Sequence, residues 1–371
     1  MVLPGVLLYT PYMSKDAVRI ATPEDNPKLV ELERNSPQGS KLQIYSERKD
    51  YFFRSTLYGN QHTLLAVDNQ ADRLIGVMAG TLKEVFLGGR ATRAAFFYDL
   101  RLHPDYRRTV LGRHMLRVWN LMDRWAEESG AALLYGLVKG DNKTMIGFQQ
   151  KKQNYRFTGK MVVLSRPVYR MKRLHRLPQE LMPEEANARI GTKVWDRYGG
   201  YQFFPTALKD RYFTEAMIDS GLFSCFTIEE GSSFASIGFF RVCQAMWTRV
   251  IRLPGYYRVL KPIFDGLRFA LPLPKIPEQG GRISYCHVFN HLADGPRGLR
   301  LWKELLAHAN NLAYQEGATL LTSAFDERDS FLPHYQKGSL NKIEYLLGYK
   351  PFVADVPEVH TPYYPDMRDM N

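Results

Sequence analysis

The segment richest in chemistry-bearing side chains spans residues 99–115 and reads DLRLHPDYRRTVLGRHM. The apolar run 94–102 predicts a strand, and a His-Pro-Asp turn ends it before a helical pattern begins. The first amides of a helix have no partners within the helix, and together with the helix dipole they attract anions. Arg107, Arg108 and Arg113 add positive charge at the same point. The segment therefore predicts a phosphate-binding loop.

The elements around this loop predict a mixed α/β unit at the start of the chain. Long apolar side chains recur at helical spacing over residues 111–126, and the nearly all-apolar run 131–138 is typical of a strand covered on both faces. Further strands are expected at residues 17–20, 62–67, 73–82, 94–102 and 160–164, and further helices from residue 22, through residue 53 and from residue 141. A basic connector, residues 170–176, follows this unit, and we place a domain boundary there.

The second half of the chain has a similar order of elements. A strand is predicted at 282–290, a turn at 295–298, a helix at 299–313 and a strand at 318–325. The segments EESGAALLYGLV and YQEGATLLTSAF share one pattern, in which a helix end is followed by a glycine and an apolar strand. We therefore predict two copies of one fold, in domains 1–170 and 171–371, of which the second is degenerate and binds no ligand.

The composition predicts a globular protein with an anionic partner. The formal net charge of +12 favours nucleic acid, a membrane surface or a phosphorylated cofactor. No long basic tail favours nucleic acid, and no window reaches the roughly 18 apolar residues that a membrane helix needs. The three cysteines have no CxxC spacing, and His287 and His291 lack companions, so we expect neither a disulfide framework nor a metal site. These features predict a cytoplasmic protein without a membrane partner.

The loop HPDYRRTVLG resembles the acetyl-CoA loop of the GNAT superfamily of N-acetyltransferases, in which Arg/Gln-x-x-Gly-x-Gly/Ala follows a strand and a proline. Arg107 stands at the first position of this pattern and Gly112 at the last. Val110 replaces the middle glycine. A β-branched residue adopts a positive φ only at a cost, so Val110 could obstruct the approach of the backbone to a pyrophosphate. The other loop amides remain available to the phosphates.

The elements that follow match the same superfamily pattern, in which a strand precedes an asparagine and a helix that contains a tyrosine. Asn142 stands at the asparagine and Phe148 at an apolar position of the helix. Gln149 stands where a tyrosine often acts as general acid on the departing thiolate. A carboxamide cannot donate a proton at neutral pH as a phenol can.

Within the superfamily, the chain resembles the plant hookless-type N-acetyltransferases and their microbial relatives. The segments NYRFTGKMVVLSRPVY and DGPRGLRLWKELLAHANNLAYQEGATLLTSAF carry this resemblance. It implies a tandem α/β fold with mixed central sheets flanked by helices, acetyl-CoA or another acyl-CoA as cosubstrate, and acetyl transfer to an amine of a small molecule or protein. The residues that it assigns to cofactor binding are Leu100, Arg101, Leu102, Arg107, Arg108, Thr109, Val110, Leu111, Gly112, Arg113, Asn142 and Phe148.

The candidate catalytic group is Asp99, which could accept a proton from the amine, directly or through a water. Asp99 lies between Tyr98 and Leu100, and a carboxylate among aromatic groups is expected to have a raised pKa. The alternative is that Asp99 pairs with Arg93 or Arg101 at a sheet edge and takes no part in catalysis.

Two other functions remain open from the sequence. Val110 and Gln149 favour a catalytically inactive GNAT-fold protein, which would act as a CoA sensor or a protein-interaction module. The net charge of +12 is compatible with a nucleic-acid-associated protein that acetylates basic tails. For the leading function, acetyl transfer to an amine, we expect the second domain to shape the substrate cleft or to mediate formation of a homodimer.

Overall fold

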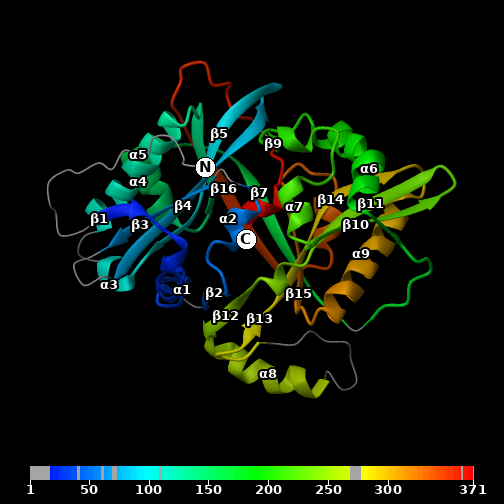
Figure 1. Ribbon diagram of the computed structural model, residues 1–371. Coiled ribbons are helices and arrows are strands. Elements are labelled where there is room, and N and C mark those ends of the chain that lie inside the picture. Colours follow the sequence, from blue (N-terminus) through cyan, green and yellow to red (C-terminus); the bar gives the residue numbers. More distant parts are fainter. Residues whose placement is uncertain are drawn as a thin grey trace.

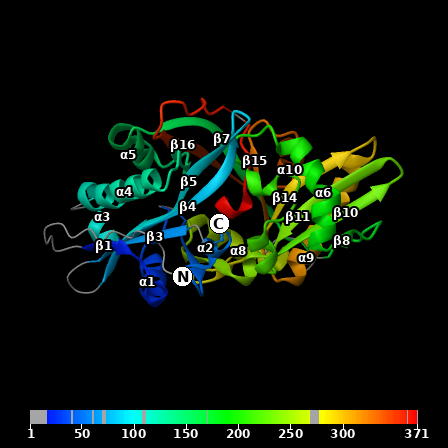
Figure 2. The same ribbon diagram turned by 45° about the horizontal axis from the view of Figure 1, so that its top comes forward.

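The computed structural model describes residues 17–39, 42–59, 62–68, 73–107, 111–169, 171–267, 277–360 and 362–370. Within these residues one large mixed sheet runs through the molecule, and helices cover both of its faces (Figure 1, Figure 2). None of the helices in this part of the chain is long and apolar enough to cross a membrane.

The large sheet has thirteen strands among the described residues. In spatial order, twelve of them are β1 (Ala17–Ile20), β3 (His62–Asp68), β4 (Leu74–Leu87), β5 (Arg90–Leu102), β6 (Leu133–Lys139), β16 (Asn341–Pro351), β7 (Arg156–Pro167), β15 (Leu320–Asp326), β14 (Tyr285–Asp294), β11 (Ser233–Phe240), β10 (Phe223–Glu230) and β8 (Gln179–Leu181). The short strand β9 (Phe204–Pro205) pairs with β4. The pairs β5–β6 and β14–β15 are parallel.

Helices α4 (Leu111–Glu128) and α5 (Lys143–Gln153) lie on one side of β3, β4 and β5, and α1 (Asn26–Arg34) lies on the other (Figure 2). Helix α4 faces the sheet with Met115, Trp119, Met122 and Ala126, all of them buried. The helix predicted from this spacing is confirmed.

The other helices are α2 (Phe53–Thr56), α3 (Pro104–Arg107), α6 (Pro183–Tyr198), α7 (Glu215–Asp219), α8 (Gly255–Leu267), α9 (Gly298–Gln315), α10 (Leu332–Gln336) and the 3-10 turns η1 (Pro23–Asp25), η2 (Thr206–Leu208), η3 (Val242–Gln244) and η4 (Met367–Met370).

The two halves of the chain exchange strands at the centre of the sheet. Strand β16, from the second half, lies between β6 and β7 of the first half, with Leu346 opposite Val138 and Ile343 opposite Val163. On its other edge β7 pairs with β15 of the second half. The sheet therefore runs without a break across the boundary that the sequence suggests near residue 170, and that boundary stays a prediction.

A second, three-stranded sheet joins segments that are far apart in sequence. It contains β13 (Arg282–Ile283), β12 (Met246–Arg252) and β2 (Gln43–Arg48), and it lies beside α8 (Figure 1). The sequence predicts helical structure through residue 53, and this is wrong for β2. The pairing of β2 with β12 is the reason, because it holds this segment extended and places Arg48 opposite Met246.

One glycine limits the space between β6 and α4. A Cβ atom at Gly136 would lie 2.3 Å from the ring of Phe97, which packs against Trp119. We expect Gly136→Ala to lower the free energy of unfolding by about 1–3 kcal/mol through overpacking, as measured by denaturant titration. Gly200→Ala is the control, since a Cβ there meets no atom within 4 Å. Equal stability of the two variants would contradict the packing described here.

Candidate active site

Strands β5 and β6 separate after a short parallel pairing. Only Ala94 to Phe96 pair with Leu133 to Tyr135, although both strands continue beyond this point. On its other edge β6 stays paired with β16 as far as Lys139. The edges of β5 and β6 that face each other therefore leave an opening in the middle of the large sheet.

A β-bulge lies on the β5 side of this opening. Tyr98 pairs with Ala79 and Arg101 with Val77, so Asp99 and Leu100 together stand opposite a single residue of β4. Asp99 has a φ of 50°, a left-handed conformation that few residues other than glycine adopt. A bulge bends its strand and redirects its backbone, so this one changes the course of β5 along the opening.

Two buried arginines hold the bulge in place. Arg48 Nη1 donates to Asp99 Oδ2 at 2.8 Å, and Arg54 Nη1 donates to Asp99 Oδ1 at 3.2 Å. Arg48 also donates from Nε and Nη2 to the two oxygens of Glu33, at 2.6 and 2.7 Å. Two carboxylates thus balance two guanidinium groups, which is the condition under which buried charges can be stable. We call Glu33, Arg48, Arg54 and Asp99 the bulge cluster.

The bulge cluster changes the expectation for Asp99. Burial acts to raise the pKa of the Asp99 carboxyl, but the attraction of Arg48, Arg54 and Arg101 outweighs it and holds this pKa well below its ordinary value. The raised pKa predicted from the sequence is therefore wrong.

The expected ion-pair partners of Asp99 are also wrong. Arg93 lies 4.0 Å from Glu84, and Arg101 pairs with Glu33 at 3.3 Å. The structure supplies arginines from β2 and α2 instead.

The 3-10 turn η4, near the end of the chain, meets the bulge cluster from the other side. Arg54 donates from Nη2 to the backbone oxygen of Asp369 at 2.6 Å and from Nε to that of Arg368 at 3.1 Å. The Asp369 carboxylate accepts from Lys83 Nζ at 2.9 Å and from Tyr58 at 2.9 Å. Burial raises the pKa of the Asp369 carboxyl, and this effect exceeds the opposing attraction of Lys83. Sequence analysis missed Asp369, because nothing in its local pattern links it to β5.

A cavity of about 810 Å³ fills the opening. Its walls include residues 96–102 of β5, residues 137–139 of β6, Thr144, Met145 and Gln149 of α5, and Asp369 and Met370 of η4. Met145 packs with the core under α4 and α5, whereas Met370 packs with the core on the opposite face of the sheet. The cavity therefore connects the two faces of the sheet.

One side chain of the cavity wall has unsatisfied hydrogen-bonding groups. Gln149 is fully buried, and neither its Nε2 nor its Oε1 has a partner among the described residues. A buried carboxamide without partners is unfavourable by about 1–3 kcal/mol. A polar ligand in the cavity would supply those partners.

The structure brings together some of the residues that the sequence assigns to cofactor binding. Leu100, Arg101, Leu102 and Asn142 line the cavity, as does Asp99. Asn142 also caps α5, because its Oδ1 accepts from the Met145 amide at 3.2 Å. Phe148 instead packs against Trp119, with ring centroids 5.7 Å apart, and is not part of the cavity wall.

The predicted phosphate loop is described only in part. The backbone of Arg107 ends α3, and Leu111, Gly112 and Arg113 form the first turn of α4. Arg108, Thr109 and Val110 lie outside the described residues. Phosphate binding by this loop stays a prediction.

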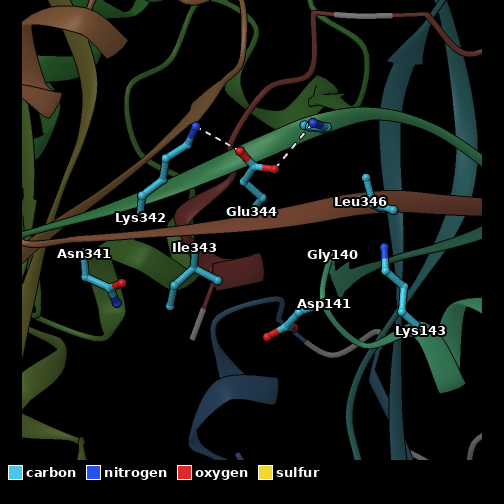
Figure 3. Close-up of a pocket in the computed structure, with 9 residues that line it drawn as sticks. Gly140, Asp141, Lys143, Asn341, Lys342, Ile343, Glu344 and Leu346 are labelled. Atoms are coloured by element: carbon cyan, nitrogen blue, oxygen red, sulfur yellow. Dashed lines mark ion pairs between the residues drawn. The ribbon is translucent and has the colours of Figure 1, made fainter.

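A smaller cavity of about 510 Å³ lies next to the first, and Asp141 lines both. Figure 3 shows Lys143 on one side of this cavity and the pair of Lys342 with Glu344 on β16. Glu344 binds Lys342 Nζ at 2.9 Å and Lys160 Nζ at 3.4 Å, so its charge is already compensated.

In the second half of the chain, β14 and β15 separate as β5 and β6 do, but aromatic side chains fill the space between them. Strand β14 pairs with β15 only from Tyr285 to His287, and Asn290 has a φ of 49° at a register shift, as Asp99 does in β5. The ring of His291 occupies the space beyond. It stacks on Phe325 at 5.0 Å and accepts from Trp302 Nε1 at 3.1 Å. Burial lowers the pKa of His291 to about 3, so this histidine is neutral.

Comparison with known proteins places this architecture. No protein-family model matches the chain. It is 21% identical over 302 residues to the probable N-acetyltransferase HLS1 of Arabidopsis thaliana, covering 71% of this chain and 74% of that protein. It is 20% identical over 269 residues to the HLS1-like probable N-acetyltransferase of the same plant, covering 66% and 64%.

The solved structures agree. Saccharomyces cerevisiae N-myristoyltransferase with bound myristoyl-CoA matches with a TM-score of 0.58 at 10% identity, over 92% of this chain and 84% of that one. A GCN5-related N-acetyltransferase from Sphaerobacter thermophilus matches with a TM-score of 0.55 at 12% identity, over 95% and 100%.

The likeness to these solved structures defines the fold class. The chain has a tandem GNAT-like fold, with a large mixed sheet flanked by helices, as the sequence predicts. Within that class, the resemblance to the hookless-type N-acetyltransferases is confirmed.

The bulge cluster leads to a stability prediction. We expect Asp99→Asn to lower the free energy of unfolding by about 3 kcal/mol or more, because Arg54 loses its carboxylate partner and Arg48 keeps only Glu33 among the described residues. Glu84→Gln, at an exposed pair, should lower it by less than about 1 kcal/mol. Denaturant unfolding of both variants gives the comparison, and similar values would contradict the role of the cluster.

The same cluster sets a pH dependence. Since the pKa of Asp99 is lowered on folding, its contribution to stability is present above its ordinary pKa and is lost as the pH falls through the lowered value. The stability difference between wild type and Asp99→Asn should therefore shrink only in strong acid.

Proposed function

We propose that the protein binds an acyl-CoA in the larger cavity and transfers the acyl group to an amine. Acetyl-CoA is the proposed donor, and the acceptor is a small molecule or a protein. The observation that carries the proposal is the opening between β5 and β6, with a bulge on one side and the unpartnered Gln149 on the other. The names of the curated relatives, which are N-acetyltransferases, support acetyl as the acyl group.

The residues of the cavity suit the chemistry of an acyl-CoA. When bound, this cosubstrate supplies an acyl group that its thioester activates for transfer. Its pantetheine arm carries amide groups that can satisfy the carboxamide of Gln149, while Leu100 and Met145 provide an apolar surface for the methylene groups. Arg107 and Arg108 precede the helix that would face the phosphates, where cations and free helix amides favour anions.

Transfer needs a neutral amine and a group that takes its proton. Asp99 is the base suggested by the sequence, but Arg48 and Arg54 hold its charge and make it a weak base. In our proposal Asp99 is a positioning residue, since its ion pairs hold the bulge of β5 in a left-handed backbone conformation.

Asp369 suits the base better. It lines the cavity, and burial raises its pKa toward the range in which a carboxylate can accept a proton at neutral pH. Lys83 is hydrogen-bonded to both Asp369 and Asp366, and its positive charge offsets negative charge on these two carboxylates.

The first prediction is direct binding of the donor. Titration calorimetry should detect acetyl-CoA in the micromolar range, with desulfo-CoA binding more weakly and ATP more weakly still. Arg107→Glu combined with Arg108→Glu should weaken binding at least about tenfold, because two attractive charges become repulsive. No detectable binding by the wild type would contradict the proposal and favour an interaction protein without catalysis.

The second prediction concerns the proton acceptor. In a free-thiol assay with a library of amines, Asp369→Asn should lower kcat by about 10²–10⁴-fold and leave the affinity for acetyl-CoA nearly unchanged. In the wild type, kcat should rise with pH as Asp369 loses its proton, and this rise should disappear in the variant. Glu84→Gln serves as a control for a surface carboxylate. A pH profile that Asp369→Asn leaves intact would exclude Asp369 as the base.

A further inference from the structure

One lysine of the protein itself lines the larger cavity. Lys139 is the last residue of β6, and it forms part of the cavity wall together with Val138 and Asp141. Side chains alternate along a strand, so Lys139 shares the face of Tyr135 and Leu137. These two residues pack in the core to which Met370 of η4 also belongs. Lys139 therefore lies on the side of the sheet where Asp369 lines the cavity.

Among the described residues, the half-buried Lys139 has no ion pair with a carboxylate, unlike the buried Lys83 and the half-buried Lys350. No carboxylate of the described residues lies within 4.0 Å of its Nζ, whereas Lys83 pairs with Asp366 and Lys350 pairs with Asp123. An unpaired, half-buried ammonium group is unfavourable in such a place. Its neutral form is a nucleophile.

Burial, rather than the charged groups around it, is the main reason that the pKa of Lys139 is lowered. Burial lowers its pKa, Asp141 opposes this, and Arg101 on the facing wall adds to it. Tyr345 stands opposite Lys139 in β16. The remaining ionised groups that line the cavity, Arg54, Asp99 and Asp369, are engaged with one another or with Lys83 and Arg48.

We propose that Lys139 is an internal acceptor, and that the protein transfers an acetyl group from acetyl-CoA to Lys139 Nζ. This inference rests on the proposed function, because it needs the donor in the cavity. The lone pair of the neutral amine attacks the thioester carbon, an N–C bond forms and the C–S bond breaks. The nitrogen then loses a proton, which neutralises the departing thiolate. Starting from the ammonium form, the reaction gives acetyl-lysine, free CoA and one proton.

Acetylation of Lys139 would limit the activity of the protein. It removes the positive charge next to Arg101 and places an acetyl group in the space that an external amine must enter. The modified protein would keep its fold, since Lys139 makes no ion pair among the described residues. External acceptors and Lys139 would then compete for the same donor.

The test is intact-mass spectrometry of the purified protein after incubation with acetyl-CoA, followed by peptide mapping. We expect the mass of one acetyl group, located on Lys139, to appear at a rate that does not depend on protein concentration. The rate should rise with pH and level off above the lowered pKa of Lys139. Lys139→Arg should abolish the modification, because a guanidinium group stays protonated.

Lys143→Arg is the matched control. Lys143 is an exposed lysine four residues further along, and it lines the smaller cavity rather than the larger one (Figure 3). This variant should be acetylated at Lys139 as fast as the wild type. Acetyl groups spread over exposed lysines, or equal labelling of Lys139→Arg and the wild type, would overturn the inference.

Calorimetry on the same samples separates this inference from the proposed function. Binding of acetyl-CoA without any modification of Lys139 would overturn the internal acceptor and leave the proposed function standing. Absence of binding would overturn both. Because the wild-type peptide map locates the acetyl group by itself, the result does not depend on how well Lys139→Arg folds.

Discussion

The arrangement of the site depends on the need to pair every charge in the bulge cluster. Removing Arg48, Arg54, Glu33 and Asp99 from water is unfavourable unless each charge meets its opposite at close range. That requirement brings α1, β2, α2 and β5 to one place, and Arg54 adds η4 through two backbone oxygens. It also explains how Asp99 can keep a left-handed backbone, since the surrounding contacts leave its carboxylate no other position.

The exchange of strands gives this cluster a rigid frame. With β16 between β6 and β7, the edge of β6 away from the opening is paired along its length, whereas the edge toward β5 is unpaired beyond Tyr135. The second half repeats the parallel pairing and the positive φ, at β14 and Asn290. There, His291, Phe325 and Trp302 occupy the space that is a cavity in the first half. One backbone geometry thus surrounds a cavity in the first half of the chain and an aromatic core in the second.

The limits of prediction from sequence follow from the range of the interactions involved. Apolar periodicity is a local signal, and it located α4 through Trp119 and Met122 and β6 through its unbroken apolar run. Strand β2 was missed because its partner β12 lies about two hundred residues away, at Met246 to Arg252. The error in the pKa of Asp99 has the same origin, since Arg48 and Arg54 are distant in sequence. Asp369 was missed because it too is distant in sequence from β5. Gln149 could be singled out because it follows Asn142 in a short segment that resembles the GNAT pattern.

The central claim is that the opening between β5 and β6 holds the acyl donor and that the opening between β14 and β15 does not. Hydrogen exchange measured by mass spectrometry, with and without acetyl-CoA, tests both parts at once. The account predicts slower exchange in peptides that cover residues 97–102 and 137–149, with no change in those that cover 288–293 and 322–326. Protection confined to the second pair of segments, or absent from both, would contradict it.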